Sequence, residues 1–199
     1  MQAKRRTKKK QKKASKTLID LRHKGLITAA EPPKDKDLSS LSPEFRARLL
    51  NVLASLQGAG KPFQLNEGYR TVDRQQWLYG SGRPQAKPYG RAGQIVTNVD
   101  GMTNKSAHQG DGSVGSGRAA DCYPIDTNGK VYIPNITDPI WKLYADTVTK
   151  EGLEAGYYWE KLKDAPHCEF VIQDKVRKSL ARKIKTIKRK RGKRTAARH

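Results

Sequence analysis

The chain lacks the features of disulfide-stabilised, membrane-spanning and secreted proteins. Only two of its 199 residues are cysteine, Cys122 and Cys168, which is too few for a disulfide scaffold. No run of about 18 apolar residues occurs, so the sequence predicts no membrane span. The N-terminus is basic, but the apolar stretch of about 7–15 residues that a secretory signal peptide needs is missing. We therefore expect no signal peptide and no export by that route.

Acidic side chains are almost absent from both ends of the chain. Residues 1–24 hold 11 Lys or Arg against one acid, and residues 175–199 hold 13 against none. Residues 25–174 carry 17 basic and 18 acidic side chains, so the net charge of +22 belongs to two terminal arms. The sequence predicts a basic arm and linker over 1–40, a near-neutral body over 41–174 and a basic C-terminal arm over 175–199.

The two arms differ in their apolar content. Residues 1–16 are too charged and too poor in apolar groups to fold alone. In the C-terminal arm four apolar residues recur at helical steps on a basic background: Val176, Leu180, Ile184 and Ile187. This amphipathic pattern is typical of a helix that lies on a membrane or packs onto its own domain. Arms of this charge would bind an anionic wall polymer, an anionic membrane surface or nucleic acid, or would only aid solubility.

The body reads as α+β, with helices before and between antiparallel strands. Ser42, Pro43 and Glu44 form a helix start, with a capping serine and proline at the first helical position. Helical spacing then continues to Gly58 or Gly60. The other expected elements are a strand over 63–69, a helix over 71–79, a loop over 80–105, a strand over 119–125, a turn over 126–129 with a return through 131–133, a helix over 139–155, and strands over 157–159 and 167–172.

Two distant segments each place a histidine near a carboxylate. One runs from His108 to Asp121, and the other contains Asp164 and His167. A catalytic zinc takes three ligands of the His, Asp or Glu type and keeps one position open. His108, Asp121 and His167 would supply these ligands, and Asp164 would act as a general base. Zn²⁺ is thus the expected cofactor.

The same segments resemble a known family. Ser-x-His at 106–108, Gly-x-Ala-x-Asp at 117–121 and Asp-x-Pro-His-x-Glu at 164–169 look like zinc peptidases of peptidoglycan. That group includes D-alanyl-D-alanine carboxypeptidases and dipeptidases and the bacteriophage L-alanyl-D-glutamate endopeptidases, which are endolysins. Gly-Tyr-Arg-Thr at 68–71 resembles the segment in which the family places an arginine near the substrate.

The resemblance implies a fold, a chemistry and a role for each residue. The fold would be Hedgehog/DD-peptidase-like, with a small antiparallel sheet flanked by helices. His108, Asp121 and His167 would bind zinc, Asp164 would be the base, and Arg70 the cationic stabiliser. Aspartate at the base position is more like the phage endopeptidases. Glu169 would orient a ligand histidine or lie on the surface of an edge strand.

The chain departs from the family in the spacing of two ligands. The family usually has seven residues from the histidine to the aspartate, whereas His108 and Asp121 are thirteen apart. The six extra residues are most simply Gly110 to Gly115. Loop closure costs little per added residue, so the insertion need not destroy the site, and it could reshape the substrate cleft beside it.

Each cysteine directly follows a proposed ligand. Neighbouring side chains on a strand face opposite ways, so Cys122 and Cys168 should point away from the metal into the layer behind the sheet. If the two strands pair, the sulfurs lie close together. The pattern favours two small buried apolar groups over a disulfide.

Two classes of function follow. The first is a bacteriolytic, antimicrobial hydrolase that cleaves the peptidoglycan stem peptide, acting as a monomer released from the host cytoplasm or carried in the virion. The second is a structural or nucleic-acid-binding phage protein built on a peptidase fold. The intact set of ligand residues favours the first, and the enlarged spacing with two basic arms keeps the second open.

Overall fold

The computed structural model describes residues 30–171. Residues 1–29 of the predicted basic arm and linker over 1–40, and the whole predicted amphipathic arm over 175–199, lie outside the described residues. Within the described part, no helix combines the length and apolar character that crossing a membrane requires.

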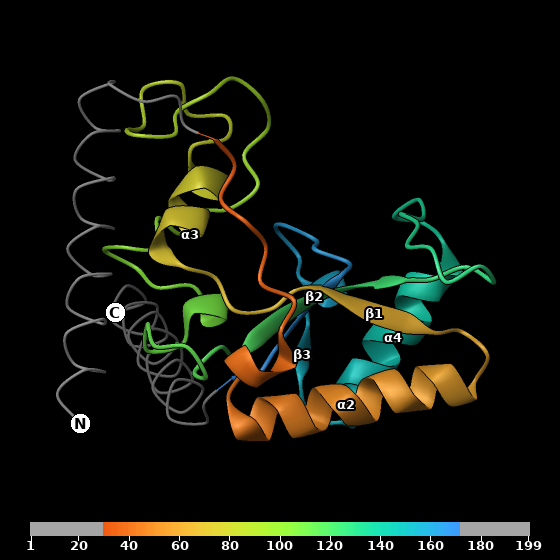
Figure 1. The fold of residues 1–199 in the computed structure, drawn as a ribbon. Helices are drawn as coiled ribbons and strands as arrows, with labels where there is room; N and C mark the ends of the chain where they lie inside the picture. Colours follow the sequence, from red (N-terminus) through yellow and green to blue (C-terminus); the bar gives the residue numbers. More distant parts are fainter. Residues whose placement is uncertain (1–29, 172–199) are drawn as a thin grey trace, which may run out of the picture.

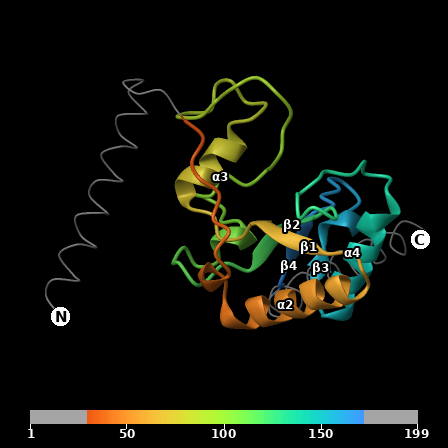
Figure 2. The same cartoon turned by 45° about the vertical axis from the view of Figure 1, so that its right-hand side comes forward.

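The described chain is α+β, as predicted, and its centre is a small antiparallel sheet (Figure 1). The strand order is β1-β2-β4-β3, in which every neighbouring pair is antiparallel. The strands are β1 (Phe63–Glu67), β2 (Ala119–Pro124), β3 (Glu154–Ala155) and β4 (His167–Glu169). Helices α2 (Pro43–Gly58) and α4 (Pro139–Lys150) pack on the sheet, while α3 (Val72–Tyr79) stands apart from them (Figure 2).

The hydrophobic core lies between the sheet and the pair α2 and α4. Both helices bury one face at helical spacing, and the buried residues are Phe45, Leu49, Val52 and Leu56 of α2 and Trp141, Tyr144, Ala145 and Val148 of α4. Phe63 of β1 stacks on the ring of Tyr144 with centroids 4.8 Å apart. Full burial of one large apolar side chain contributes about 1.5–3 kcal/mol to stability. The buried side chains of α2 and α4 therefore hold the sheet firmly by one face, and its opposite face points away from this core.

The helix predicted from Ser42 is present, but its capping differs. Ser42 occupies the N-cap, yet its side chain makes no capping hydrogen bond. Its backbone N–H instead donates to the carbonyl of Gly117 at 2.8 Å. The start of α2 is therefore tied to the segment that leads into β2.

Two predictions in the second half of the body are wrong in detail. The helix predicted over 139–155 ends at Lys150, because Gly152 takes a positive φ of 72° and turns the chain into β3. The strand predicted over 157–159 is a 3-10 helix, η3 (Gly156–Tyr158), closed by Trp159 N–H donating to the carbonyl of Gly156.

The predicted hairpin after β2 is present only as a turn. Asp126 accepts hydrogen bonds from the backbone of Asn128 and Lys130. The return through 131–133 forms a single bridge between Ile125 and Val131 and no strand. Ile133 is 78% exposed, so this segment has too little apolar burial to extend the sheet.

Segment 31–40, which the sequence indicates as a linker, makes specific contacts with the body. The Gly68 N–H donates to the Asp35 carbonyl at 2.7 Å, and the Arg74 guanidinium pairs with Glu31 at 2.6 Å. A short 3-10 helix, η1 (Leu38–Ser40), then leads to the buried Leu41. The predicted loop over 80–105 contains no regular helix or strand apart from a bridge between Ser81 and Arg91.

Candidate metal centre

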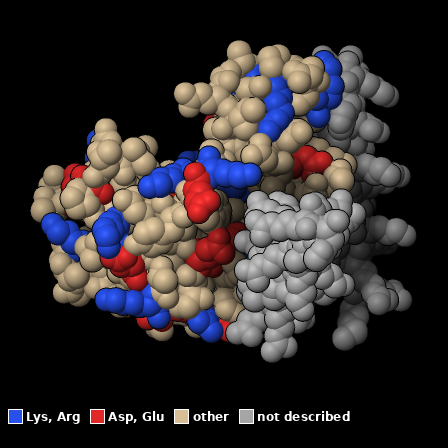
Figure 3. All heavy atoms as spheres, turned by 180° about the vertical axis from the view of Figure 1, so that it is seen from behind, with Lys and Arg blue, Asp and Glu red and all other residues tan. Residues whose placement is uncertain are grey.

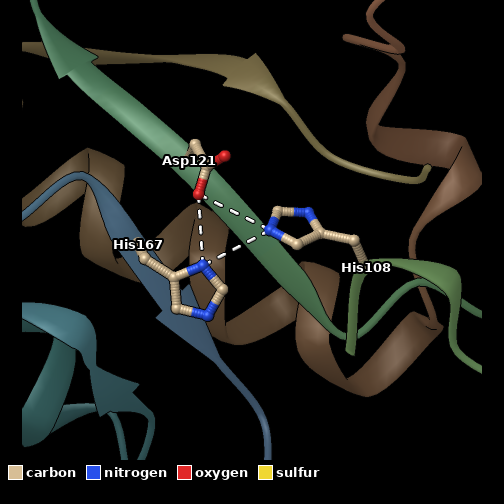
Figure 4. Close-up of side chains that lie close together, drawn as sticks. All are labelled: His108, Asp121 and His167. Carbon is tan, nitrogen blue, oxygen red and sulfur yellow. Dashed lines mark hydrogen bonds and ion pairs between the residues drawn. The ribbon is translucent and has the colours of Figure 1, made fainter. Parts of the chain in front are cut away.

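Three elements bring His108, Asp121 and His167 together. His108 lies in the 3-10 helix η2 (Ala107–Gln109), Asp121 on β2 and His167 on β4. Asp121 and His167 are direct partners in the β2–β4 register. Figure 4 shows the three side chains converging from these elements, with their ligand-type atoms facing one another. The structure thus places the three predicted ligands in one cluster.

The three facing atoms form a nearly equilateral triangle. The Asp121 Oδ1 atom lies 3.2 Å from His167 Nδ1 and 3.5 Å from His108 Nε2, and the two nitrogens are 3.3 Å apart. Zinc bonds of about 2.0–2.1 Å at tetrahedral angles place ligand atoms about 3.3 Å apart. The donor set, two imidazoles and one carboxylate, and its spacing therefore fit a tetrahedral zinc ion.

The other ring nitrogen of each histidine has its own partner. Nδ1 of His108 lies 2.6 Å from the Gly68 carbonyl, which requires that nitrogen to carry the proton and leaves Nε2 with a free lone pair. Nε2 of His167 lies 3.4 Å from Glu169 Oε2, which leaves Nδ1 for the cluster. Such outer partners are typical of metal-binding histidines.

The local fold around His108 is fixed by a capping box. The Ser106 hydroxyl accepts a hydrogen bond from the His108 N–H, and the Gln109 side chain accepts one from the Ser106 N–H. His108 is only 1% exposed. The serine of the Ser-x-His motif therefore sets the backbone that orients the histidine.

Burial and neighbouring groups shift the pKa values of the two histidines in opposite directions. Burial, followed by the charge of Arg70, lowers the pKa of His108, which favours the neutral form that binds metal. Burial lowers the pKa of His167, but hydrogen bonds to Asp121 and Glu169 outweigh it and raise the value to about 9. In the metal-free protein His167 is thus protonated at neutral pH, and metal binding has to displace that proton.

Arg70 contacts the outer side of the cluster. Its Nη2 atom lies 2.5 Å from Asp121 Oδ2 and 3.1 Å from Glu67 Oε2. Burial raises the pKa of Asp121, but its interactions with His108 and with the charge of Arg70 hold it well below its usual range. Arg70 therefore touches a proposed ligand, and its Nε–H is buried with no acceptor among the described residues.

Asp164 lines the same cavity as the cluster. The cavity has a volume of about 770 Å³, and its lining includes Arg70, His108, Asp121, Asp164 and His167. Burial, followed by the charge of Asp121, raises the pKa of Asp164 to about 6. The Asp164 backbone packs closely on Gly156, where an added Cβ would lie 2.5 Å from the Asp164 carbonyl oxygen. This close approach requires glycine at position 156.

The extra residues between His108 and Asp121 lie away from the cavity. None of residues 110–115 lines it. The segment packs instead against the N-terminal part of the body, since Gly112 accepts a hydrogen bond from Tyr69 Oη and the Gly115 N–H donates to the Ser40 carbonyl. Among the described residues, the extra segment therefore contributes no side chain to the lining of this cavity.

The cysteines lie behind the sheet, as predicted. Cys122 and Cys168 are fully buried in the hydrophobic core and are not joined in a disulfide. Burial raises the pKa of both thiols, that of Cys168 to about 12. They act as small apolar core residues.

Sequence reasoning missed two buried charges beside the centre, Glu67 and Arg74. Each is 3% exposed, and they form an ion pair of 2.7 Å. No motif marks them, although Glu67 lies directly before the Gly-Tyr-Arg-Thr segment. The position of Glu67 depends on an irregularity in β1 that the sequence pattern does not indicate.

No family model matches the sequence. Among solved structures, the chain is similar to the L-Ala D-Glu endopeptidase ChiX of Serratia marcescens, with 18% identity, 73% of this chain and 91% of that chain covered, and a TM-score of 0.44. It is also similar to the LD-carboxypeptidase LdcB, with 18% identity, 73% and 70% coverage and a TM-score of 0.42. A third is a mutant of the vancomycin-resistance D,D-pentapeptidase VanY in complex with Zn(II), with 15% identity, 73% and 83% coverage and a TM-score of 0.42. These similarities are low, so the function of the chain is inferred from its own residues.

Proposed function

We propose that the chain is a zinc-dependent peptidoglycan peptidase that hydrolyses a peptide bond of the stem peptide. The observation that carries the proposal is the triangle of His108 Nε2, Asp121 Oδ1 and His167 Nδ1, with edges of 3.2 to 3.5 Å. Two imidazole nitrogens, both neutral once a metal has displaced the proton of His167, and one carboxylate would leave a fourth position for water or substrate, as in catalytic zinc sites.

A bound zinc ion would supply Lewis acidity, polarising the scissile carbonyl and lowering the pKa of the attacking water. Asp164 is the general base in this proposal. It lines the cavity beside the ligands, and burial raises its pKa to about 6 in the metal-free protein. A carboxylate with a raised pKa accepts a proton from water more readily and can return it to the departing amine.

Arg70 stabilises the negative charge that develops on the carbonyl oxygen. Its Nη2 is held by Asp121 and Glu67, while the buried Nε–H has no acceptor among the described residues. A preorganised donor with no other partner is suited to an oxygen that gains charge in the transition state.

The favoured bond is L-alanyl-D-glutamate, as in the phage endolysins that the motifs resemble, with a D-alanyl-D-alanine carboxypeptidase as the other specificity. The aspartate at position 164 supports the first. The basic arms would hold the enzyme on anionic wall polymers or membrane surfaces. The enzyme would reach the wall from the host cytoplasm at lysis or from the virion.

The test is digestion of purified peptidoglycan, with the new amino termini identified by mass spectrometry. Wild-type protein loaded with zinc should release fragments that begin with D-glutamate, and Asp164→Asn should bind zinc but release none. Fragments that have lost only a terminal D-alanine would assign the carboxypeptidase specificity. Absence of any cleavage by zinc-loaded wild type would refute the proposal and favour the nucleic-acid-binding alternative.

A further inference from the structure

We infer that Glu67 is a positioning residue of the metal centre, which acts through Arg70 on Asp121. The inference rests on the proposed function in one respect, the assignment of Asp121 as a metal ligand. Glu67 touches none of the three ligand-type atoms of the triangle. Glu67 acts on Asp121 through one guanidinium nitrogen, Arg70 Nη2, which lies within ion-pair distance of the carboxylates of both Glu67 and Asp121.

A bulge in β1 places Glu67 on the metal side of the sheet. Phe63 to Leu65 pair with Pro124 to Cys122 in regular antiparallel register, but Glu67 pairs with Asp121 after a register shift. In an unbroken strand Glu67 would face the same way as Leu65, two residues earlier, which packs in the core beside Cys122. The extra residue, Asn66, re-aims the glutamate to the face that carries Asp121.

Two carboxylates that pair directly across strands repel each other unless a cation lies between them. Glu67 is 3% and Asp121 8% exposed, so water screens this repulsion poorly. Arg70 supplies the cation. Its Nη2 lies 3.1 Å from Glu67 Oε2 and 2.5 Å from Asp121 Oδ2. The guanidinium is therefore shared, and neither carboxylate takes its whole charge.

Glu67 is itself held at its second oxygen. Arg74 Nε donates to Glu67 Oε1 at 2.7 Å, and the same arginine reaches Glu31 through Nη1 at 2.6 Å. The glutamate thus has an arginine on each oxygen and little freedom to move. Burial raises the pKa of Glu67, but the charge of Arg70 and the hydrogen bond from Arg74 leave it lowered.

The position of Arg70 determines which oxygen of Asp121 faces the candidate metal position. Arg70 occupies the Oδ2 side, so Oδ1 alone faces the two histidine nitrogens (Figure 4). Asp121 is thereby set as a one-oxygen ligand. Without the negative charge of Glu67, Arg70 would bind Asp121 alone and draw more electron density from it. Asp121 would then be a weaker ligand.

The decisive experiment is a zinc affinity measurement by competition with a chromophoric chelator, on full-length protein. Glu67→Gln keeps the shape of the side chain and removes its charge, and we expect zinc binding to weaken by about 10–100-fold. Glu31→Gln is the matched control, because it removes the other acid on Arg74, and it should change zinc affinity by less than about 2-fold.

A double-mutant cycle separates action through Arg70 from general loosening of the fold. If Glu67 acts through Arg70, then Glu67→Gln should cause no further loss of zinc affinity when Arg70 is already Gln. Equal losses in both backgrounds, or no loss in Glu67→Gln, would overturn the inference. If Glu67→Gln fails to fold, Glu67→Asp replaces it in the same cycle, with a smaller expected loss. Zinc binding in wild type without wall cleavage would refute only the proposed activity, whereas no zinc binding in wild type would refute both.

Discussion

Glu169 Oε2 lies 3.4 Å from Nε2 of His167, two residues earlier on the same short strand. Residues two apart on a strand face the same side, so β4 carries both a candidate ligand and the group that orients it. The contact leaves Nδ1 of His167 facing Asp121 at 3.2 Å. The contact with Glu169 thus leaves Nδ1, and not Nε2, facing the candidate metal position.

The first prediction follows from this contact. Glu169→Gln weakens the acceptor for His167 Nε2–H, so zinc affinity should fall by about 10-fold. Chelator competition measures it. Glu160→Gln, on an exposed residue of the segment that precedes β4, is the control and should have no effect. Unchanged affinity in Glu169→Gln would show that the contact does not orient the ligand.

The second prediction concerns the pH dependence of stability in the metal-free protein. Burial and then Asp121 raise the pKa of Asp164 from 3.8 to about 6, so folding disfavours its ionised form. This cost is absent below pH 3.8, grows as the pH rises towards 6, and is complete above it. Asp164→Asn should therefore stabilise the chelator-treated protein by about 1–2 kcal/mol at pH 7.5 and by almost nothing at pH 3.5. Urea unfolding at both pH values measures this difference. A variant that is less stable than wild type at pH 7.5 would contradict it.

The third prediction concerns the extra residues between His108 and Asp121. The backbones of Gly110 and Ser116 nearly touch, since a Cβ on Gly110 would lie 1.9 Å from the Ser116 carbonyl oxygen. Deleting residues 111–115 and joining these two should thus leave zinc affinity within about 3-fold of wild type. Stability should fall by about 1 kcal/mol, because Tyr69 loses its hydrogen bond to Gly112. Loss of zinc binding in the deletion variant would show that the segment supports the site.

The fourth prediction concerns the thiols. Because Cys122 and Cys168 are fully buried and burial raises the pKa of each, neither should react with a thiol reagent at pH 8 in the folded protein. Both should react after denaturation without reductant. No reactive thiol in the denatured protein would indicate a disulfide between the two cysteines and contradict the core packing described above.

The sequence predicts the parts of this molecule that depend on short-range pattern. Proline at position 43 and helical apolar spacing predict α2, and motif residues predict the convergence of His108, Asp121 and His167. Residues two apart on a strand face the same side. This suggests that Glu169 orients His167, which is one of two interpretations that the sequence leaves open.

The features that the sequence does not predict depend on contacts between distant parts of the chain. The bulge that re-aims Glu67 arises from the pairing of β1 with β2, and no residue of β1 signals it. Helix α4 ends at Lys150 instead of residue 155, because the chain turns at Gly152 to enter β3. Tertiary contacts also decide which residues line the cavity. The extra residues after His108 contact Ser40 and do not line the cavity.

Metal stoichiometry tests the central claim most directly. Protein equilibrated with zinc and freed of excess metal should contain one zinc ion per chain by inductively coupled plasma mass spectrometry. His167→Ala and His108→Ala should each retain far less under the same conditions, because two ligands hold zinc poorly. Wild-type protein without zinc, or histidine variants that keep a full equivalent, would contradict the assignment of this cluster as a metal centre.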